Sequence, residues 1–487
     1  MNSRIRLVAL VAALMVLALL GNLTYFSVAK EEGLTAQAAN VREVYQDFDR
    51  QRGAITAGAT VIAETVAAPE TDQFTRQRTY PAGPVYAPAT GFFSFVYATR
   101  ALENSYNDYL AGTDESQWMQ SIADIWSGET PTGATVATTL DPVVQQAAYD
   151  ALGTAKGAVV VLDPHSGAVR AMVSTPSYDP NTLASHDFEA VSAGWAALLA
   201  DPDQPMLNRA AREVFPPGST AKLITAAAAL KEGYRPDTVI DTPSSIQLPN
   251  SSNWLPNASP CGNSQQTFAY ALAMSCNTSF ANIGRALGPD KLRQQAEAFG
   301  FNRAHLDEIG DAPSRYFTRL DDQGDLVAVA PDQAQVMMSA MGQWEIAASP
   351  LQMAMVVGAI VNDGVLMEPY LVADVTTAQG DKLYTHQPQS SQAMAQPDAA
   401  TLKQMMTGVV EWGTGTAGRT PGVAMGGKTG TAEWQAGQAP YSWYVAYACD
   451  PDVVVAVFIE EAPVAATDMA SGALAGPILR SIVEATR

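Results

Sequence analysis

The stretch Phe215-Pro-Pro-Gly-Ser-Thr-Ala-Lys222, followed by the Ala-rich run Leu223–Leu230, decides the fold and the chemistry of this chain. Pro and Gly set the chain direction, and the Ala-rich run favours a helix. Ser219 is therefore expected at the helix N-terminus, with Lys222 three residues later on the same face. An apolar helix buries both side chains, and burial lowers a lysine pKa, giving a neutral amine that accepts the serine proton. The helix N-terminus favours the negative charge that develops.

This spacing alone has a simpler interpretation, because Ser219 can be an ordinary helix cap. The chain also contains Ser27-Val-Ala-Lys30, which has the same S-x-x-K spacing at the end of an apolar segment. The motifs that follow must therefore decide between the two interpretations.

A second polar motif, Ser275-Cys276-Asn277, lies between the apolar helical stretches Phe268–Met274 and Phe280–Leu287. On a bend, the serine and the asparagine can face one cleft. The serine then relays a proton to a leaving group, and the amide orients a substrate and the lysine. The alternative is a polar turn between helices, since Ser105-Tyr-Asn107 and Ser251-Ser-Asn253 have the same pattern.

The third motif is Gly426-Gly-Lys-Thr-Gly-Thr-Ala432, which holds the only Lys-Thr-Gly of the chain and lies in a strand context. Glycines inside a strand mark close approach by a backbone or a ligand, and an exposed strand edge can pair with an extended peptide. Lys428 and Thr429 supply donors for a carboxylate. The Thr431 N–H is expected to join the Ser219 N–H in an oxyanion hole. A plain Gly-rich hairpin is the alternative.

Composition limits the class of protein. The 487 residues allow two or three domains, and 47% hydrophobic with 16% charged residues exclude a disordered chain. A net charge of −21 argues against nucleic acid as a partner. The four histidines have no pair at one-turn spacing and give little support for a zinc site: His165, His186, His305 and His386.

The N-terminus indicates export. Arg4 and Arg6 precede the apolar run Leu7–Leu20, and residues 7–29 would form a helix of about 34 Å, long enough to span a bilayer. The two arginines are expected to keep residues 1–6 in the cytoplasm. A signal peptide cleaved after Ser27-Val-Ala29 is the alternative, and it exports the rest of the chain equally. Outside the cytoplasm Cys261 and Cys276 can pair, or remain reduced and buried, with Cys449 unpaired in an apolar strand.

Regular signals begin near residue 141. Asp141-Pro142 predicts a helix start, and two apolar runs around the turn Asp163–Gly167 predict a hairpin at the edge of a larger sheet. Residues 380–400 are interpreted as a solvated loop. Late strands are expected at 423–434, 443–448 and 453–459, and a final helix at 471–485. This order predicts an antiparallel sheet covered by helices, an α/β sandwich.

The three motifs occur in the order S-x-x-K, S-x-N and K-T-G after an export signal, and so the sequence resembles the penicillin-recognising serine acyltransferases. Their spacing, together with the segment Ala168–Pro180 and the run Arg52-Gly-Ala-Ile55, looks like that of the class B, monofunctional penicillin-binding proteins. The resemblance implies an antiparallel sheet sandwiched by helices with a helical subdomain. It also implies an α+β pedestal, similar to a dimerisation domain, over residues 30–134 and a transpeptidase domain over 135–487. The pedestal is too short for a glycosyltransferase domain.

The activity that this resemblance implies is that of a peptidoglycan D,D-transpeptidase without a cofactor. Ser219 would attack the penultimate D-Ala carbonyl of a stem peptide ending in D-Ala-D-Ala, Lys222 would be the base, and Ser275 would shuttle a proton. The substrate-binding residues would be Asn277, Lys428, Thr429, Gly430 and Thr431. β-Lactam antibiotics would acylate Ser219. Divisome proteins and a lipid-linked glycan polymerase would be partners, and the N-terminal helix would hold the protein in the plasma membrane.

Other functions remain to be weighed against this one. Ala221 and Gly342-Gln343-Trp344 depart from the family pattern, but neither is expected to touch the catalytic groups. A β-lactamase of the same fold would need a Glu-x-x-x-Asn run between Ser275 and Lys428, and the sequence has none there. A D,D-carboxypeptidase differs only in its acceptor. A catalytically silent divisome scaffold would tolerate loss of Ser219. A Ser/His/Asp hydrolase would need a Gly-x-Ser-x-Gly elbow, which the sequence lacks.

Overall fold

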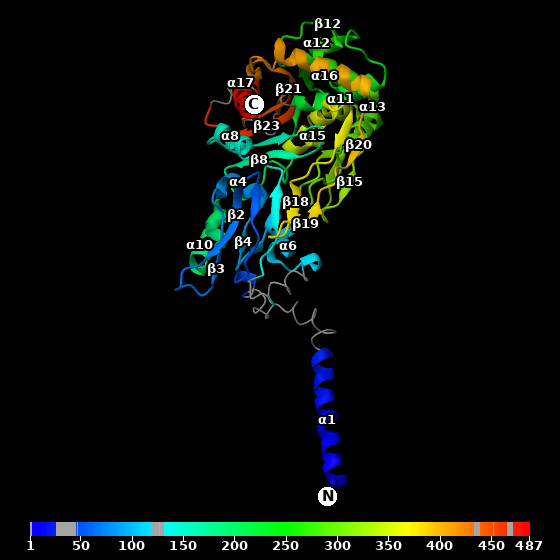
Figure 1. Ribbon diagram of the computed structural model, residues 1–487. Coiled ribbons are helices and arrows are strands. Elements are labelled where there is room, and N and C mark those ends of the chain that lie inside the picture. Colours follow the sequence, from blue (N-terminus) through cyan, green and yellow to red (C-terminus); the bar gives the residue numbers. More distant parts are fainter. Residues whose placement is uncertain are drawn as a thin grey trace.

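The computed structural model describes residues 2–25, 45, 47–117, 126, 131–432, 439–450, 452–464 and 471–487. Helix α1 (Asn2–Thr24) is fully exposed, lies apart from the other described elements, and is apolar enough over Arg4–Thr24 to cross a membrane, with a mean hydropathy of 2.4 (Figure 1). It contains the expected apolar run. The last residues of the predicted span, 26–29, lie outside the described part of the chain.

A five-stranded antiparallel sheet forms the centre of the C-terminal unit, in the order β21-β22-β23-β7-β8. Its strands are β7 (Lys156–Leu162), β8 (Val169–Thr175), β21 (Ala424–Ala432), β22 (Tyr441–Cys449) and β23 (Val453–Glu461). The predicted hairpin is confirmed, since β7 pairs with β8, and β8 is one edge of the sheet. The opposite edge, β21, carries the Lys-Thr-Gly motif.

Helices cover both faces of this sheet because its strands are apolar on both sides. Val159 and Val161 pack in the cluster formed with α8 (Pro142–Leu152) and α17 (Ser471–Ala485). Val160 points to the other face, where α11 (Lys222–Lys231), α15 (Pro350–Val361) and α16 (Gln396–Glu411) pack. Asp141 caps α8 by accepting from the Val143 and Val144 N–H groups, as the sequence predicts. The expected final helix is confirmed as α17.

A helical subdomain lies beside α11 and contributes the second motif (Figure 1). Its helices are α12 (Phe268–Ala273), α13 (Asn277–Ala298) and α14 (Gln333–Ser339). Ten short strands accompany them and pair two by two: β10 (Ser245–Gln247) with β11 (Trp254–Pro256), β9 (Val239–Thr242) with β12 (Ser264–Thr267), β13 (Arg315–Tyr316) with β16 (Ile346–Ala347), β14 (Thr318–Leu320) with β15 (Leu326–Ala328), and β17 (Val365–Met367) with β20 (Ser390–Gln392).

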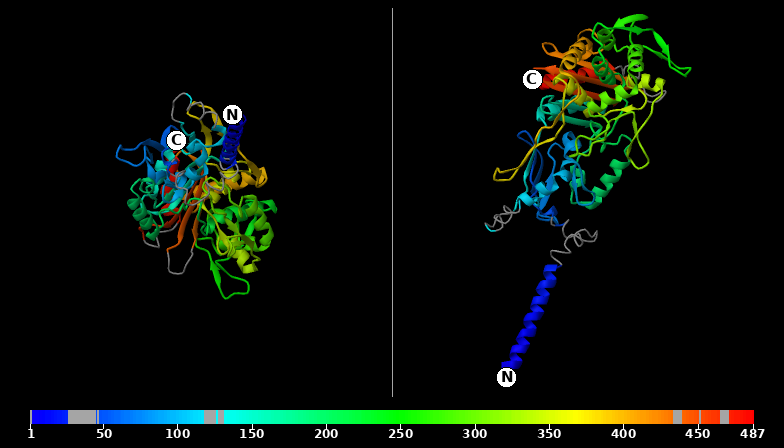
Figure 2. Two further views of the ribbon diagram at one scale, coloured as in Figure 1. Left: turned by 90° about the horizontal axis from the view of Figure 1, so that it is seen from below. Right: turned by 90° about the vertical axis from the view of Figure 1, so that its right-hand side faces the viewer.

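The N-terminal unit is a pedestal around a six-stranded sheet, in the order β19-β18-β6-β1-β2-β3. Its strands come from three parts of the chain: β1 (Ile55–Ala57), β2 (Thr60–Ala67), β3 (Arg76–Thr79), β6 (Thr135–Thr138), β18 (Val372–Thr376) and β19 (Lys382–Thr385). The boundary predicted at residue 134 therefore falls directly before a strand of this sheet, and two further strands come from beyond residue 370. Figure 2 shows the two units stacked along the long direction of the molecule.

The interpretation of residues 380–400 as a solvated loop is wrong. Strand β19 pairs with β18, β20 pairs with β17, and α16 begins at Gln396. Strands β19 and β20 each have one partner strand and pair through their backbones, which leaves their polar side chains in solvent and gives no signal in the side-chain pattern.

The remaining described elements of the pedestal surround one buried ionic cluster. They are α4 (Gly83–Thr90), β4 (Phe93–Ser94), β5 (Ala98–Thr99), α5 (Leu102–Ser105), α6 (Asn107–Ala111), a 3₁₀ turn at Glu115–Gln117, and the packed helices α9 (Asn181–Ala184) and α10 (Phe188–Ala200). The Glu103 carboxylate accepts from Arg52 at 2.9 Å and from Arg78 at 2.6 Å. These pairs join α5 to β3 and to the chain before β1.

Candidate active site

The first motif forms a 3₁₀ turn, η3 (Gly218–Ala221), that runs directly into α11. The turn is fixed against the edge of the sheet, where a Cβ on Gly218 would lie 2.6 Å from the Thr431 carbonyl oxygen. Gly218 has a φ of +52°, so glycine is required there both by conformation and by this close approach. Ser219 consequently lies at the start of the helix and beside the K-T-G strand, as the sequence predicts.

Lys222 is completely buried at the first turn of α11. Its Nζ donates to the Ser275 carbonyl at 2.8 Å, to Ser275 Oγ at 3.1 Å and to Asn277 Oδ1 at 2.7 Å. All three acceptors are neutral. Burial, reinforced by the charge of nearby Lys428, holds the pKa of Lys222 well below its ordinary value. Among the described residues no side-chain hydrogen bond of Ser219 is formed, so its hydroxyl is available to a substrate.

Ser275 connects the two lysines. It lies between α12 and α13 with a φ of +57°, a left-handed conformation that is uncommon for a residue with a side chain. Its Oγ accepts from Lys222 at 3.1 Å and from Lys428 Nζ at 2.9 Å. When Lys222 is an ammonium, both acceptor positions of Ser275 Oγ are used and the hydroxyl proton is free to point into the cleft. Neutral Lys222 has only two N–H groups, so its lone pair replaces one of the three donated contacts.

The K-T-G motif lies on β21, whose outer edge has no partner strand within the described sheet. Lys428 is completely buried, donates to the Thr429 carbonyl at 2.9 Å, and has a pKa that burial lowers to about 7. Thr429 Oγ1 is 2.6 Å from Thr414 Oγ1. Sequence reasoning missed Thr414, and the small-residue run Gly413-Thr-Gly-Thr416 is the signal that marks it.

The three motifs share one cleft of about 720 Å³. Its walls come from η3, the chain after β11, α14 and the residues that follow it, the start of α17, and β21. The lining residues are Ser219, Leu255, Pro256, Ala258, Ser259, Ser275, Asn277, Met338, Met341, Gln343, Thr414, Thr416, Ala417, Thr429, Thr431, Gly472 and Ala473. Of the predicted site residues, Lys222, Lys428 and Gly430 lie behind this surface rather than on it.

Both ends of the Asn277 side-chain amide have partners in the protein. Its Oδ1 binds Lys222, and its Nδ2 donates to the Pro256 carbonyl at 3.1 Å. Nδ2 has a second N–H, which is available to the carbonyl oxygen of a substrate amide while the contact with Pro256 is kept.

The segment Gly342-Gln343-Trp344 is not expected to touch the named catalytic groups, and Gly342 contacts Gly218, the neighbour of Ser219. The Gly342 carbonyl accepts from the Gly218 N–H at 3.1 Å, directly beside Ser219. A Cβ on Gly342 would lie 1.8 Å from the Gly218 carbonyl oxygen, and Gln343 lines the cleft. The segment supports the nucleophile turn because tertiary packing, not sequence spacing, brings the two glycines together.

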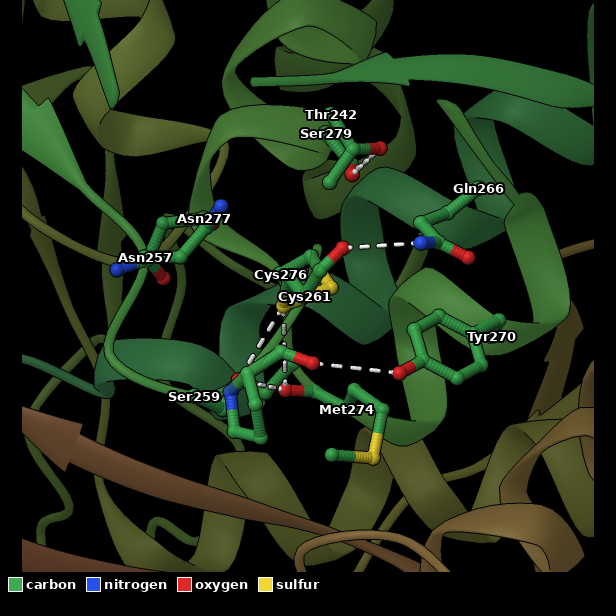
Figure 3. Close-up of a disulfide and its surroundings, with 12 residues drawn as sticks. Thr242, Asn257, Ser259, Cys261, Gln266, Tyr270, Met274, Cys276, Asn277 and Ser279 are labelled. Carbon is green, nitrogen blue, oxygen red and sulfur yellow. Dashed lines mark hydrogen bonds between the residues drawn. A yellow bond between two sulfur atoms is a disulfide. The ribbon is translucent and has the colours of Figure 1, made fainter. Parts of the chain in front are cut away.

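Cys261 and Cys276 form a disulfide with a Cα–Cα distance of 5.7 Å, which decides between the two alternatives that the sequence leaves open. Figure 3 shows the pair beside Asn277, with Gln266 Nε2 donating to the Cys261 carbonyl at 3.0 Å. The hydroxyl of Ser259 donates to the Met274 carbonyl. The disulfide thus ties the cleft wall at 258–259 to the S-x-N bend. Cys449 is free, on β22.

A serine at a helix start, a lysine of lowered pKa on the same face, and an open strand edge beside them define the class of serine acyltransferases that use a lysine base. Comparisons with known proteins agree with this class. Residues 157–484 match the family described as "Penicillin binding protein transpeptidase domain", and residues 52–136 match "Penicillin binding protein A dimerisation domain".

Individual relatives extend the similarity to the whole chain. The chain is 39% identical to the peptidoglycan D,D-transpeptidase PbpA of Mycolicibacterium smegmatis, covering 100% of this chain and 99% of the relative. It is 38% identical to PbpA of Mycobacterium tuberculosis, with the same coverage. The structure of penicillin-binding protein A from M. tuberculosis as a penicillin G acyl-enzyme superposes with a TM-score of 0.81 at 37% identity, over 90% of this chain and 99% of that one. The chain belongs to the penicillin-binding protein transpeptidase family, and its full length is similar to penicillin-binding protein A.

Proposed function

We propose that this chain is a peptidoglycan D,D-transpeptidase that cross-links stem peptides through an acyl-enzyme on Ser219 and that β-lactams inhibit by acylating the same residue. The observation that carries the proposal is the contact of two buried lysines, Lys222 and Lys428, with one hydroxyl, that of Ser275, in the cleft that Ser219 lines. The relatives named D,D-transpeptidase support the substrate class.

In the acylation step, Ser219 Oγ attacks the carbonyl carbon of the penultimate D-Ala, and its proton passes to neutral Lys222. The new C–O bond forms while the C–N bond to the terminal D-Ala breaks. The leaving amine takes a proton through Ser275, which Lys222 contacts directly. The backbone N–H groups of Ser219 and Thr431 hold the oxyanion, an interaction worth about 10²–10³ in rate for each donor.

The terminal carboxylate of the substrate binds at β21. Thr429 and Thr431 line the cleft there, Gly430 keeps the strand close to η3, and Lys428 provides positive charge from behind. Asn277 donates its second Nδ2–H to the carbonyl oxygen of the substrate amide. An extended stem peptide can add to the open edge of β21 as a further strand.

In the second step a side-chain amine of a neighbouring stem attacks the ester carbonyl and gives up a proton to neutral Lys222 as the new C–N bond forms. Lys222 returns a proton to Ser219 Oγ as the ester C–O bond breaks. Water in place of the amine would make the protein a D,D-carboxypeptidase. Analysis of the products from a stem peptide with and without an amine acceptor separates these functions, and we expect cross-linked dimer when the amine is present.

The topology and partners belong to the same proposal. Residues 1–6 lie in the cytoplasm, residues 7–29 anchor the chain in the plasma membrane, and the pedestal (30–134) and transpeptidase domain (135–487) lie outside. The apolar, unpacked α1 supports the anchor. Divisome proteins and a lipid-linked glycan polymerase act with the enzyme, since cross-linking requires newly polymerised strands.

The test is the intact mass of the full-length chain in detergent after incubation with benzylpenicillin. We expect the mass to rise by one penicillin and the adduct to persist for tens of minutes. Ser219→Ala should show no adduct, whereas Ser192→Ala, an exposed serine on α10, should react like the parent protein.

Absence of an adduct on the parent protein would overturn the proposal and favour the scaffold function. An adduct that disappears together with the free drug would instead identify a β-lactamase.

A further inference from the structure

A second cavity, of about 260 Å³, is lined by residues of α4 and α10 and of the chain near each of them in sequence. Its lining residues are Ala87, Pro88, Gly91, Phe92, Arg100 and Ala101 from the α4 region, and Tyr178, Trp195, Met206, Asn208 and Arg212 from the α10 region. It shares no lining residue with the catalytic cleft, and the proposed function does not use it.

Two solvent-exposed arginines, Arg100 and Arg212, line this cavity. Arg100 and Arg212 both lie close enough to Tyr178 to act on the pKa of its hydroxyl, which burial raises and the two arginines lower in part. Neither guanidinium forms an ion pair or a side-chain hydrogen bond within the described part of the chain, and no Asp or Glu lines the cavity. In a chain with 49 acidic and 28 basic residues, this arrangement favours an anionic ligand.

The other walls of the cavity are apolar and aromatic. The Phe92 ring packs edge-on against Trp195, with ring centroids 6.0 Å apart, and against Tyr178 at 6.3 Å. Met206 and Pro88 add aliphatic surface. These walls suit a ligand whose anionic group is attached to an apolar body.

The one side-chain amide that lines the cavity, that of Asn208, already has hydrogen-bond partners in the protein. Asn208 is 5% exposed, donates to the Pro88 carbonyl at 3.0 Å, and accepts from the Ala210 N–H at 3.0 Å. The recognition of an anion therefore falls to the two arginines, with the Tyr178 hydroxyl as a further donor.

We propose that this cavity is a binding site for an organic oxyanion, a carboxylate or a phosphate on a compact apolar body, held by Arg100 and Arg212 together. The cavity volume equals that of roughly nine water molecules, which limits the bound part of the ligand to the end of a larger molecule or to a small metabolite. Guanidinium groups bind both oxyanions in a bidentate manner. A peptide carboxyl terminus and a phosphate monoester are the two sources of this chemistry.

The test uses full-length protein first acylated at Ser219 with benzylpenicillin, so that the catalytic cleft is filled. Binding is measured by calorimetry and by the fluorescence change of Trp195, with Trp195→Phe to assign the signal. The probes are N-acetyl-D-Ala-D-Ala, its neutral C-terminal amide, and phenyl phosphate.

We expect at least one of the two anionic probes to bind at about 1 mM or below and the amide not to bind. Arg100→Gln and Arg212→Gln should each weaken binding about tenfold, because a charge-assisted contact is lost. Arg319→Gln, which removes an exposed arginine from β14, should leave binding unchanged. The stronger anionic probe identifies the source as carboxylate or phosphate.

The proposal is overturned if neither anion binds, or if binding survives both arginine substitutions. Neither arginine belongs to the catalytic machinery, so both variants should still be acylated by benzylpenicillin at the parent rate. That reaction shows that each variant is folded, and it separates failure of this site from failure of the proposed function.

Discussion

The pedestal and the catalytic cleft both bury positive charge, but they compensate for it differently. In the pedestal, Arg52 and Arg78 surround the Glu103 carboxylate, and all three side chains are almost inaccessible to solvent. In the cleft, Lys222 and Lys428 are equally buried but contact only hydroxyl, carbonyl and amide oxygens.

The difference explains what each cluster does. Although burial raises the pKa of Glu103, the charges of Arg78 and Arg52 bring it below its ordinary value, so the cluster stays ionised and holds the pedestal together. No carboxylate compensates Lys222, and its pKa falls. A buried charge with a counter-charge stays ionised, whereas a buried lysine without one has a lowered pKa, which suits the base role proposed for Lys222.

The largest expected effect is on the catalytic side. Lys222→Met removes the base while it preserves apolar volume, and we expect the acylation rate with benzylpenicillin to fall by about 10³–10⁴. Stability should not fall, because no carboxylate is left unpaired. Stopped-flow acylation and urea unfolding on the same samples check both statements, and a variant that acylates within about tenfold of the parent would remove Lys222 from the mechanism.

The matching change in the pedestal should have the opposite result. Glu103→Gln leaves two buried arginines without a counter-charge, and we expect the free energy of unfolding to fall by about 3–5 kcal/mol. The acylation rate of the folded protein should stay the same. Urea unfolding measures the loss, with exposed Glu70→Gln as the control, and equal stabilities of the two variants would show that the cluster does not hold the pedestal.

A pH experiment tests the cleft without removing its base. The Lys428 pKa is about 7 in the folded protein against an ordinary value of 10.5, so the unfolded chain binds more protons between these values. Stability should therefore rise with pH in this window, by about 1.4 kcal/mol per pH unit from this group. Lys428→Met should lack that part of the slope. Equal slopes for the two proteins between pH 7.5 and 9.5 would contradict the lowered pKa.

The smallest effect concerns a neutral member of the pedestal cluster. The Tyr80 hydroxyl donates to Glu103 at 3.1 Å and accepts from the Phe93 N–H at 2.8 Å. Tyr80→Phe should cost about 1–2 kcal/mol in thermal or urea unfolding, since the Phe93 N–H loses its partner in a buried site. Tyr97→Phe is the control, and a loss as large as that of Glu103→Gln would mean that the hydroxyl, not the charge, dominates.

Local sequence could predict those parts of the site that lie on one element. The three-residue spacing of Ser219 and Lys222, the bend at Ser275 and the strand at Lys428 all follow from local chemistry, and the structure brings them into one cleft. The meeting of both lysines at Ser275 Oγ could not be predicted, because it depends on the crossing of α11, α13 and β21. Thr414 and Gly342 were missed for the same reason.

The fold also could be predicted only where it depends on local sequence. The five-stranded sheet was predictable from continuous apolar runs and a tight hairpin. The pedestal sheet was not, because β1 pairs in parallel with β6, some 80 positions later, and β6 pairs with β18, more than 230 positions beyond that. Pairing over such distances leaves no periodic signal in either segment.

The late sequence positions of β18 and β19 determine when the pedestal sheet can be completed. During synthesis the strands near the N-terminus exist early, but β6 must wait for residues 372–376 before its second neighbour exists. Until then one edge of β6 stands open, which is a site for wrong pairing. The pedestal sheet is therefore begun by the first part of the chain and completed only after most of the chain has been made.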